Sequence, residues 1–444
     1  MASGLQTTMA SPTETTTTTY FADLAAGKPI RYDMTASKGK ALFATKSFVP
    51  GEPLFNEMPF VSMQHVPNQS LVQGCENCHV IVGSIEQQLA HVLHVEVGAV
   101  PPLPNQLVGK VPVNGKCTCA CGAIYCSPTC RSAAWERYHC VLCTGHPDTP
   151  MHDFLQHAID TNEIFLLAAQ VLGRISVAYA KDQDMAAARR PVDMFCKLPW
   201  WEVVASEEDL EEGQSMDEYC GIFRHLLEET FALFMDGLRF NSAHLVLHEP
   251  HPDETSDFMS ALHWENVVSD GVANGFLSVD FFANVVGMFE MNNISMEVRH
   301  PLSLLAERYE DSGDAEIAAW LDVVETQVRV QVKMHMDNDD DQDEDDDADE
   351  HEEEEDEDDD IMYPDLDGTA LFSLVCTMNH SCEPNVAVCY ESNGLATVVA
   401  LAPIATGDEL CIAYIETEQD VEARTHDLRE YKFECQCPRC LRER

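Results

Sequence analysis

Basic residues are scarce in this sequence, which has 26 lysines and arginines against 77 aspartates and glutamates in 444 residues. The formal charge is −51, and much of it comes from residues 337–360, where 20 of 24 side chains are acidic and none is Lys or Arg. So negative a chain repels nucleic acid backbones and anionic lipid surfaces. The composition therefore predicts no direct contact with nucleic acid and favours a basic protein as partner.

Long apolar stretches are also missing, because no run of about 18 uninterrupted apolar residues occurs. The threonine-rich N-terminus has neither the basic nor the apolar segment of a secretory leader. We therefore predict a soluble intracellular protein without membrane contact, whose residues 1–30 are disordered. No internal repeat is evident, and the length predicts two to four folded units.

The hydrophobic pattern predicts an α+β protein. An alternating apolar stretch broken by Pro50-Gly51 indicates two short strands around a turn. Residues 151–333 have apolar side chains at helical spacing, and Ser278 is a suitable N-cap for one of the helices. Segments rich in Val, Ile and Tyr then predict strands at 386–390, 396–401 and 410–414.

The 18 cysteines are not spread as in a secreted disulfide framework, because most of them lie in residues 75–143 and 435–440. Paired donors a few residues apart let one turn present two soft ligands to a tetrahedral zinc ion. The first cluster therefore predicts two structural zinc sites, with the ligands Cys75, Cys78, Cys119, Cys121, Cys126, Cys130, His139 and Cys143. Cys117 is an equally available donor in place of Cys119. Because this segment has little apolar periodicity, we expect metal rather than a core to stabilise it.

The C-terminal cluster, Cys435, Cys437 and Cys440, supplies three thiols, which cannot complete a tetrahedron alone. Cys382, in the tetrapeptide Asn379-His380-Ser381-Cys382, is the natural fourth donor. Such a site would tie the C-terminal segment to a segment more than 50 residues earlier and so order a pocket. The two clusters together predict about three zinc ions.

Five motifs between residues 38 and 440 carry a family resemblance. They are Gly39-Lys40-Ala41-Leu42-Phe43-Ala44-Thr45, the first cysteine and histidine series, Asn379-His380-Ser381-Cys382, Gly407-Asp408-Glu409-Leu410 running to Tyr414, and Tyr431-Lys432-Phe433-Glu434-Cys435-Gln436-Cys437. With these motifs the chain resembles the SET- and MYND-domain protein-lysine methyltransferases, in the shorter branch without a helical C-terminal domain.

The resemblance implies a split, β-rich SET domain with insertions. The expected segments are a disordered N-terminus (1–30), the N-terminal part of SET (31–74), a MYND-type zinc module (75–143), a helical insert (144–336), an acidic disordered loop (337–360), the SET core (361–417) and a post-SET zinc segment (418–444). In this fold the Asn379-His380 segment passes beneath a loop formed by the C-terminal part.

The resemblance also implies an enzyme that methylates lysine side chains of a basic protein such as a histone tail, with S-adenosylmethionine (SAM) as cofactor. SAM would lie across Lys38, Gly39, Lys40 and Ala41, with Asn379, His380, Tyr414 and Phe433 as its other contacts. Tyr414 and Tyr431 would line the channel of the target lysine as the catalytic pair. Asn292 and Asn293 are expected near the same pocket. We expect a monomer in the nucleus and cytoplasm.

Methyl transfer is an in-line displacement, so the protein chiefly has to align donor and acceptor and to desolvate a neutral amine. A phenol with a pKa near 10 is a poor base at neutral pH, so Tyr414 is expected to position the reactants. Two other hypotheses remain open, a catalytically silent scaffold and an acidic histone-binding chaperone. Ala41, which stands where the family usually has glycine, favours the scaffold. The acidic run is either an idle linker or a lure for basic tails.

Overall fold

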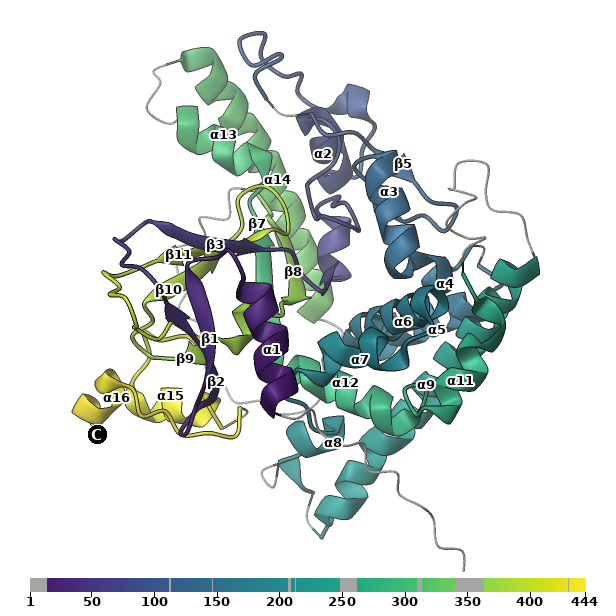
Figure 1. Cartoon of the computed structure of the whole chain (residues 1–444). Helices are drawn as coiled ribbons and strands as arrows, with labels where there is room; N and C mark the ends of the chain where they lie inside the picture. Colours follow the sequence, from purple (N-terminus) through teal and green to yellow (C-terminus); the bar gives the residue numbers. More distant parts are fainter. Residues whose placement is uncertain are drawn as a thin grey trace, which may run out of the picture.

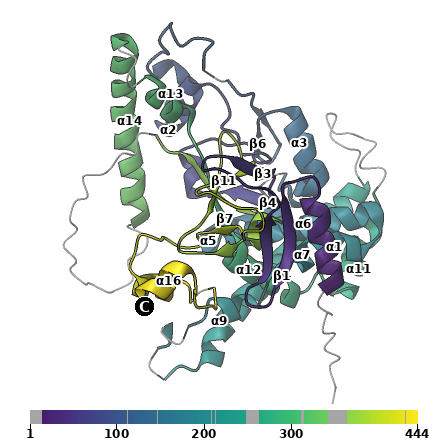
Figure 2. The same cartoon turned by 60° about the vertical axis from the view of Figure 1, so that its left-hand side comes forward.

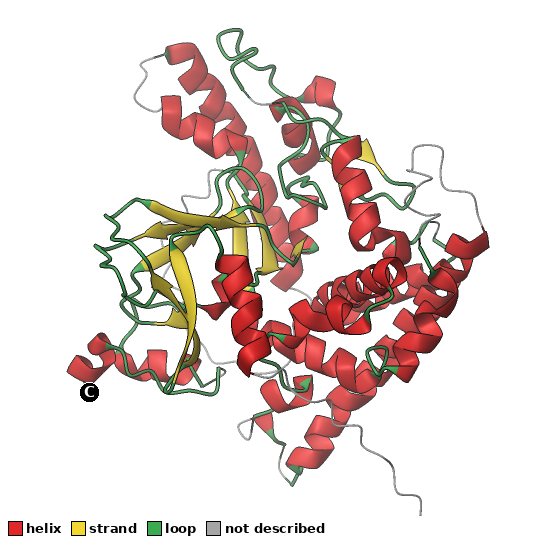
Figure 3. Ribbon diagram, in the orientation of Figure 1, coloured by secondary structure: helices red, strands yellow, loops and turns green. Residues whose placement is uncertain are grey.

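The computed structural model describes residues 14–111, 113–145, 147–206, 209–211, 213–247, 262–309, 314–340, 363–429 and 431–444. Most strands gather on one side of the molecule and the long helices of residues 150–292 on the other (Figures 1 and 3). The predicted α+β class is confirmed.

Two of the sheets join the beginning of the chain to its end. In one, β8 (Leu366–Leu371) lies between β4 (Val61–Gln64) and β7 (Ile294–Val298), with both pairs antiparallel. In the other, β11 (Ala396–Ala400) lies between β3 (Pro53–Glu57) and β10 (Val386–Cys389). Residues 53–64 thus complete sheets whose other strands come from residues 294–400, as the predicted split domain requires.

The N-terminal segment is more ordered than predicted. A hairpin of β1 (Ile30–Thr35) and β2 (Gly39–Ala44) is preceded by α1 (Glu14–Ala25), which lies beside it (Figure 1). The ring of Phe21 in α1 stacks on Tyr32 in β1 at 4.6 Å between centroids, and Phe21 is fully buried. The prediction of disorder is therefore wrong for residues 14–30, because two apolar residues of this threonine-rich helix reach the core. Residues 1–13 lie outside the described residues.

The helical layer forms the largest apolar core. Its helices are α5 (Pro150–Thr161), α6 (Ile164–Asp182), α7 (Met185–Asp193), α8 (Trp200–Val203), α9 (Met216–Leu247), α11 (Val267–Ala273) and α12 (Val279–Asn292). The helix predicted from Ser278 is confirmed, since the Ser278 side chain accepts a hydrogen bond from the Phe281 amide and caps α12. By length and composition α6 could cross a membrane, but 67% of its apolar window is buried inside the protein, as in a core helix.

The predicted helical insert does not remain helical to its end. After α12, residues 294–298 form β7, and only then follow α13 (Pro301–Tyr309) and α14 (Ala315–Asp340). The prediction missed β7 because five residues give a weak alternating pattern, and its pairing with β8 decides its structure. Helix α14 stands at the side of the molecule (Figure 2) and includes the first four residues of the acidic run. Residues 341–360 lie outside the described residues.

The metal-module segment contains more apolar packing than predicted. Besides β5 (Cys117–Thr118), β6 (Ile124–Tyr125), α3 (Pro128–Ala134), the following π-helical turn (Trp135–His139) and α4 (Cys140–Leu142), it holds α2 (Ile85–Val92). Residues Ile85 and Leu89 of α2 pack against Val324 and Val328 of α14 in a core of their own. The expectation that metal alone stabilises residues 75–143 is therefore wrong for the α2 region, because α14 supplies the missing apolar partner.

The C-terminal region is short and tightly connected. Strand β9 (Asn379–His380) pairs in parallel with β12 (Cys411–Ile412), and two short helices follow, α15 (Val421–Asp427) and α16 (Pro438–Glu443). The strand predicted at 410–414 is thus limited to two residues. Both helices lie beneath the β1–β2 hairpin in Figure 1.

Candidate functional site

Twelve cysteine and histidine side chains come together as three groups of four. Group 1 is Cys75, Cys78, Cys126 and Cys130, group 2 is Cys119, Cys121, His139 and Cys143, and group 3 is Cys382, Cys435, Cys437 and Cys440. In each group the four donor atoms all lie within 4.8 Å of one another. These are the twelve residues predicted as ligands.

The separations within the groups suit a tetrahedral zinc ion. With a Zn–S bond of about 2.3 Å, two ligand sulfurs should lie about 3.8 Å apart. The Sγ to Sγ distance is 3.7 Å for Cys78 and Cys126, 3.7 Å for Cys119 and Cys143, and 3.9 Å for Cys382 and Cys435. Disulfides would need about 2.05 Å, and all 18 cysteines are free thiols. The donor sets therefore fit zinc.

Cys117 and Cys119 are distinguished by the fold. Strand β5 pairs Cys117 with Tyr125 of β6, whereas Cys119 lies beyond the strand, where its backbone bonds with Ala123 and Gly122 form a tight turn. This turn brings the thiols of Cys119 and Cys121 to His139 and Cys143. Cys117 belongs to none of the three groups.

Group 1 is anchored to the sheets. The backbone N–H of Gly394, in the turn between β10 and β11, donates to the carbonyl of Cys78 at 2.8 Å. The buried His79 shares a hydrogen bond with Ser62 of β4, with 2.7 Å between Nε2 and Oγ. A Cβ on Gly394 would lie only 2.9 Å from the His79 ring, so this close approach requires glycine. The metal module is thereby held against the split domain.

Group 3 has a buried cationic neighbour that the sequence did not reveal. Arg424 of α15 is fully buried, makes an ion pair with Glu443, and lies near the thiols of Cys382 and Cys440. Its guanidinium offsets the negative charge that four thiolates around a divalent ion retain. Arginine in a short exposed-looking helix carries no sequence signal of such a role.

Asn379 connects the segments that resemble a cofactor site. Its Nδ2 donates to the carbonyl of Lys40 and to Oε1 of Glu409, both at 2.9 Å. The other carboxylate oxygen of Glu409 makes an ion pair with Lys38 at 2.8 Å. Glu409 therefore belongs to this network, although we predicted only its motif and not its side chain as part of the site.

The predicted cofactor residues 38–41, at the start of β2, differ in their surroundings. Gly39 has φ +74°, a left-handed conformation that favours glycine. Lys40 turns inward to donate to the carbonyl of Met194, and burial lowers its pKa. Burial by itself would lower the pKa of Lys38, but the hydrogen bond to Glu409 and the negative charge of its carboxylate together raise that pKa. Ala41 is fully covered by protein, so its Cβ does not project into an open space.

His380 is held as a neutral imidazole. Its Nδ1 accepts the backbone N–H of Tyr414 at 3.0 Å, which leaves the ring proton on Nε2, 3.2 Å from the Cys382 sulfur. Burial lowers its pKa to about 4. His380 therefore connects β9, Tyr414 and group 3 rather than serving as a proton carrier at neutral pH.

Tyr414 is the centre of an aromatic cluster. Its ring centroid lies 5.4 Å from His380, 5.1 Å from Tyr431 and 6.3 Å from Phe433, which it meets edge to face. The Tyr414 hydroxyl donates to the carbonyl of Met378 at 2.7 Å, and the Tyr431 hydroxyl donates to the carbonyl of Tyr414 at 3.3 Å. Burial raises the pKa of Tyr414, so its hydroxyl stays protonated.

Two cavities meet at the tyrosine pair. One, of about 340 Å³, is mostly apolar and includes Val386, Val388, Leu401 and Ile412. The other, of about 430 Å³, is polar and includes Asn162, Glu163, Glu290 and Thr369. Both are lined by Asn293, Ser295, Tyr414 and Tyr431. Tyr414 thus touches His380 and Phe433 and also the wall of both cavities.

Asn292 and Asn293 lie at the end of α12, on the cavity side of Tyr414. Asn292 donates to the carbonyl of Cys196 at 2.9 Å, and its own carbonyl accepts the thiol of Cys376 at 2.9 Å. Cys376 lines the apolar cavity and was missed by sequence reasoning, because a lone thiol three residues before Asn379 has no distinguishing spacing. These residues join the helical layer to the candidate site.

A family model for the SET domain matches residues 201–415. The chain is 24% identical to the histone-lysine N-methyltransferase ATXR2 of Arabidopsis thaliana, over 91% of this chain and 88% of that protein. It is 28% identical to the protein-lysine N-trimethyltransferase SMYD5 of Homo sapiens, over 92% of this chain and 85% of that protein. A SET and MYND domain-containing protein of Dictyostelium discoideum is 34% identical over 17% of this chain and 22% of that protein. These similarities confirm the resemblance that the five motifs predicted.

Proposed function

We propose that this SET-domain chain, similar along most of its length to the SET- and MYND-type lysine methyltransferases, transfers methyl groups from SAM to lysine side chains of a basic protein. The observation that carries the proposal is the position of Tyr414. Tyr414 contacts His380 and Phe433, which belong to the predicted cofactor set, and it also lines the apolar cavity. In-line methyl transfer needs the methyl donor and the amine acceptor on two sides of such a wall.

The apolar cavity suits the aliphatic stem of lysine. Val386, Val388 and Ile412 exclude water along it, which favours the neutral amine that the reaction requires. The Tyr414 hydroxyl donates a hydrogen bond to the Met378 carbonyl and, because burial raises its pKa, stays protonated and does not take a proton from the amine. Tyr414 and Tyr431 therefore act by fixing the position of the amine, and bound SAM supplies an electrophilic methyl on a sulfonium.

On the cofactor side, we assign the contacts to Lys38, Gly39, Lys40, Asn379, His380 and Phe433. The Phe433 ring is 39% exposed and so has a face free to stack on an adenine. The burial of Ala41 supports this assignment against a catalytically silent scaffold, because the extra Cβ is already accommodated by the protein. We also assign one zinc ion to each of the three groups of four donors, on their tetrahedral spacing.

The polar cavity supports a basic substrate such as a histone tail, which would place the activity in the nucleus. Glu163 and Glu290 lie on its wall beside the tyrosine pair. The overall charge of −51 would attract positively charged tails toward it.

The central test compares Tyr414→Phe with Tyr390→Phe. Tyr390 has a buried hydroxyl without a hydrogen-bond partner among the described residues and does not line either cavity, so removal of this hydroxyl is the matched control. We expect Tyr414→Phe to reduce transfer of radiolabelled methyl from SAM to core histones by roughly 100-fold or more, and Tyr390→Phe to change it little. Calorimetry should find SAM binding within about threefold of the unmodified protein in both variants.

Equal activity of the two variants would contradict the role of Tyr414. If the unmodified protein binds SAM but methylates neither histones nor any protein of a cell lysate, the scaffold hypothesis replaces the enzyme.

A further inference from the structure

A third cavity, of about 530 Å³, lies between the metal module, strand β4 and helices α5 and α6. Its size is in the range of sites for small organic molecules. It includes neither Tyr414 nor Tyr431 and shares only Met63 with the polar cavity of the candidate methyl-transfer site. Much of its wall is apolar, from Leu155 and Ile159 of α5 and Leu166 and Ala169 of α6.

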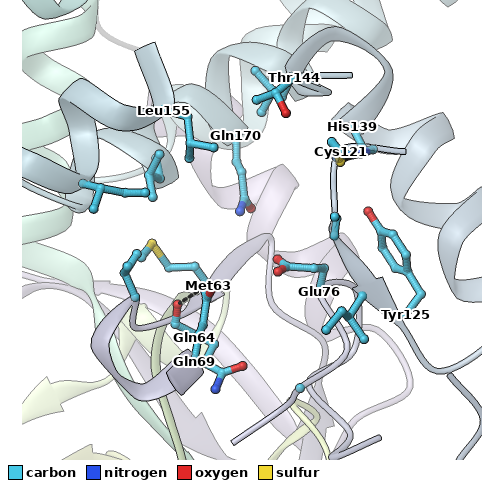
Figure 4. Close-up of a pocket in the computed structure, with 18 of the residues that line it drawn as sticks. Met63, Gln64, Gln69, Glu76, Cys121, Tyr125, His139, Thr144, Leu155 and Gln170 are labelled. Atoms are coloured by element: carbon cyan, nitrogen blue, oxygen red, sulfur yellow. Dashed lines mark hydrogen bonds between the residues drawn. The ribbon is translucent and has the colours of Figure 1, made fainter. Parts of the chain in front are cut away.

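Three polar side chains on its wall, Glu76, Gln170 and Tyr125, lack partners among the described residues. Figure 4 shows the carboxylate of Glu76 and the amide of Gln170 directed into the same space from opposite walls. Neither side chain makes a hydrogen bond or ion pair among the described residues, and the hydroxyl of the fully buried Tyr125 has no partner either. Unpaired polar groups in a largely apolar wall are costly unless a ligand satisfies them.

The backbone fixes Glu76 in this position. Its N–H donates to the carbonyl of Ile124 at 2.8 Å, and its carbonyl accepts the hydroxyl of Tyr138 at 3.3 Å. It also lies between Cys75 and Cys78 of group 1, so the turn that presents these thiols presents the carboxylate as well. The backbone of Glu76 therefore cannot move away from the cavity without disturbing the metal site.

The charge around the cavity is negative. No lysine or arginine is among the described residues that line it. Cys121 and His139 of group 2 lie on its wall, and three thiolates around one divalent ion leave a net negative charge there. A cation is the ligand group that satisfies a carboxylate in such surroundings.

We propose that this cavity binds a small organic cation with an ammonium group on an apolar body. The ammonium group donates to the Glu76 carboxylate, Gln170 supplies a further hydrogen bond, and the apolar body packs between α5 and α6. The site goes beyond the proposed methyl transfer and does not depend on it.

The test uses the full-length, zinc-loaded protein and three probes of equal length, n-butylammonium, 1-butanol and butyrate. Ligand-observed NMR titration measures their binding. We expect n-butylammonium to bind at least about tenfold more tightly than the neutral probe, and butyrate not to bind. Equal binding of the ammonium and the alcohol, or no binding of any probe, overturns the proposal.

Three variants locate the bound cation. Glu76→Gln should weaken binding of n-butylammonium by about tenfold, while Glu96→Gln, which removes the same charge from an exposed position of the module outside the cavity, should leave it unchanged. Ala169→Leu, a substitution in α6 rather than in the metal module, narrows the cavity and should also abolish binding. Zinc content shows whether the Glu76 variant keeps its metal sites. If both Glu76→Gln and Ala169→Leu bind as the unmodified protein does, the proposal is wrong.

Tyr414→Phe separates this site from the methyl-transfer site. The variant should bind n-butylammonium with unchanged affinity, whether or not it transfers methyl groups. Loss of binding in Tyr414→Phe would instead place the amine in the lysine cavity and overturn the proposal.

Discussion

The helical layer and the metal module bury very different side chains. In the helical layer the rings of Phe165, Phe231 and Phe234 surround Phe282, with centroids 5.7 to 6.3 Å apart. Around the metal groups of residues 75–143, the buried cluster has only five members, Cys75, Val82, Tyr125, Ala134 and Tyr138. The first region gains its stability from apolar area, whereas the second has too little and depends on its thiols and the ions that we assign to them.

The helical layer and the metal groups also have different roles in the candidate site. The helical layer supplies Asn293 and part of the lysine cavity, and its rigidity keeps that cavity in shape. Group 3 instead ties the last residues of the chain, including Phe433, to His380. On the proposed assignment, the metal of group 3 would order the cofactor side of the candidate site, while apolar packing orders the substrate side.

Removal of metal should produce the largest difference between the helical layer and the metal-dependent segments. The protein as isolated should contain about three zinc ions per chain. A strong chelator should abolish the hydrogen-exchange protection of residues 117–143 and 431–444, because their order depends on the thiol groups, while α6 and α12 stay protected. Equal loss of protection in α12 would show that the two regions are one cooperative unit.

Substitution of single cysteines should distinguish the metal ligands from neighbouring thiols that bind no metal. Cys119→Ser should lose about one of the three zinc ions, since a hydroxyl is a poor replacement for a thiolate in a closed site. Cys117→Ser, two residues away and outside all three groups, is the matched control and should keep all of its metal. Atomic absorption measures both. The reverse result would mean that Cys117 is the ligand.

Truncation of a side chain in the helical core should lower the free energy of unfolding without changing the zinc content. Phe282→Ala should lower the free energy of unfolding by about 3–5 kcal/mol, because it leaves a cavity among three rings. Ile222→Ala, at a side chain of α9 that is 57% exposed, should change it by about 0.5 kcal/mol or less. Denaturant titration measures both. Release of zinc from folded Phe282→Ala would contradict the division between the regions.

The smallest effect is expected at the cap of α12. Ser278→Ala should cost about 1 kcal/mol, since the Phe281 amide loses its acceptor, and Ser278→Asp should restore most of it. Urea unfolding followed by circular dichroism resolves a change of this size. If Ser278→Ala is as stable as the unmodified protein, α12 is held by packing alone.

Where the signal was local, the sequence predicted the structure well. Helical spacing predicted α9, and Ser278 predicted the start of α12, because both depend on neighbouring residues. Strand β7 and helix α1 were missed because each is fixed by a distant partner, β8 for the strand and Tyr32 of β1 for Phe21.

The sequence by itself indicated the candidate metal donors, with Cys117 and Cys119 left as alternatives, and the motifs of the candidate site. Both rest on local signals, because donor pairs and the Asn379-His380 segment are recognised from residues a few positions apart. Only the tertiary structure decided how these pieces combine. It joined Cys75 and Cys78 to the third donor pair rather than the second, brought Tyr414 to the border of two cavities, and directed Glu76 into a third. These relations depend on the path of the chain between the motifs, which local spacing does not encode.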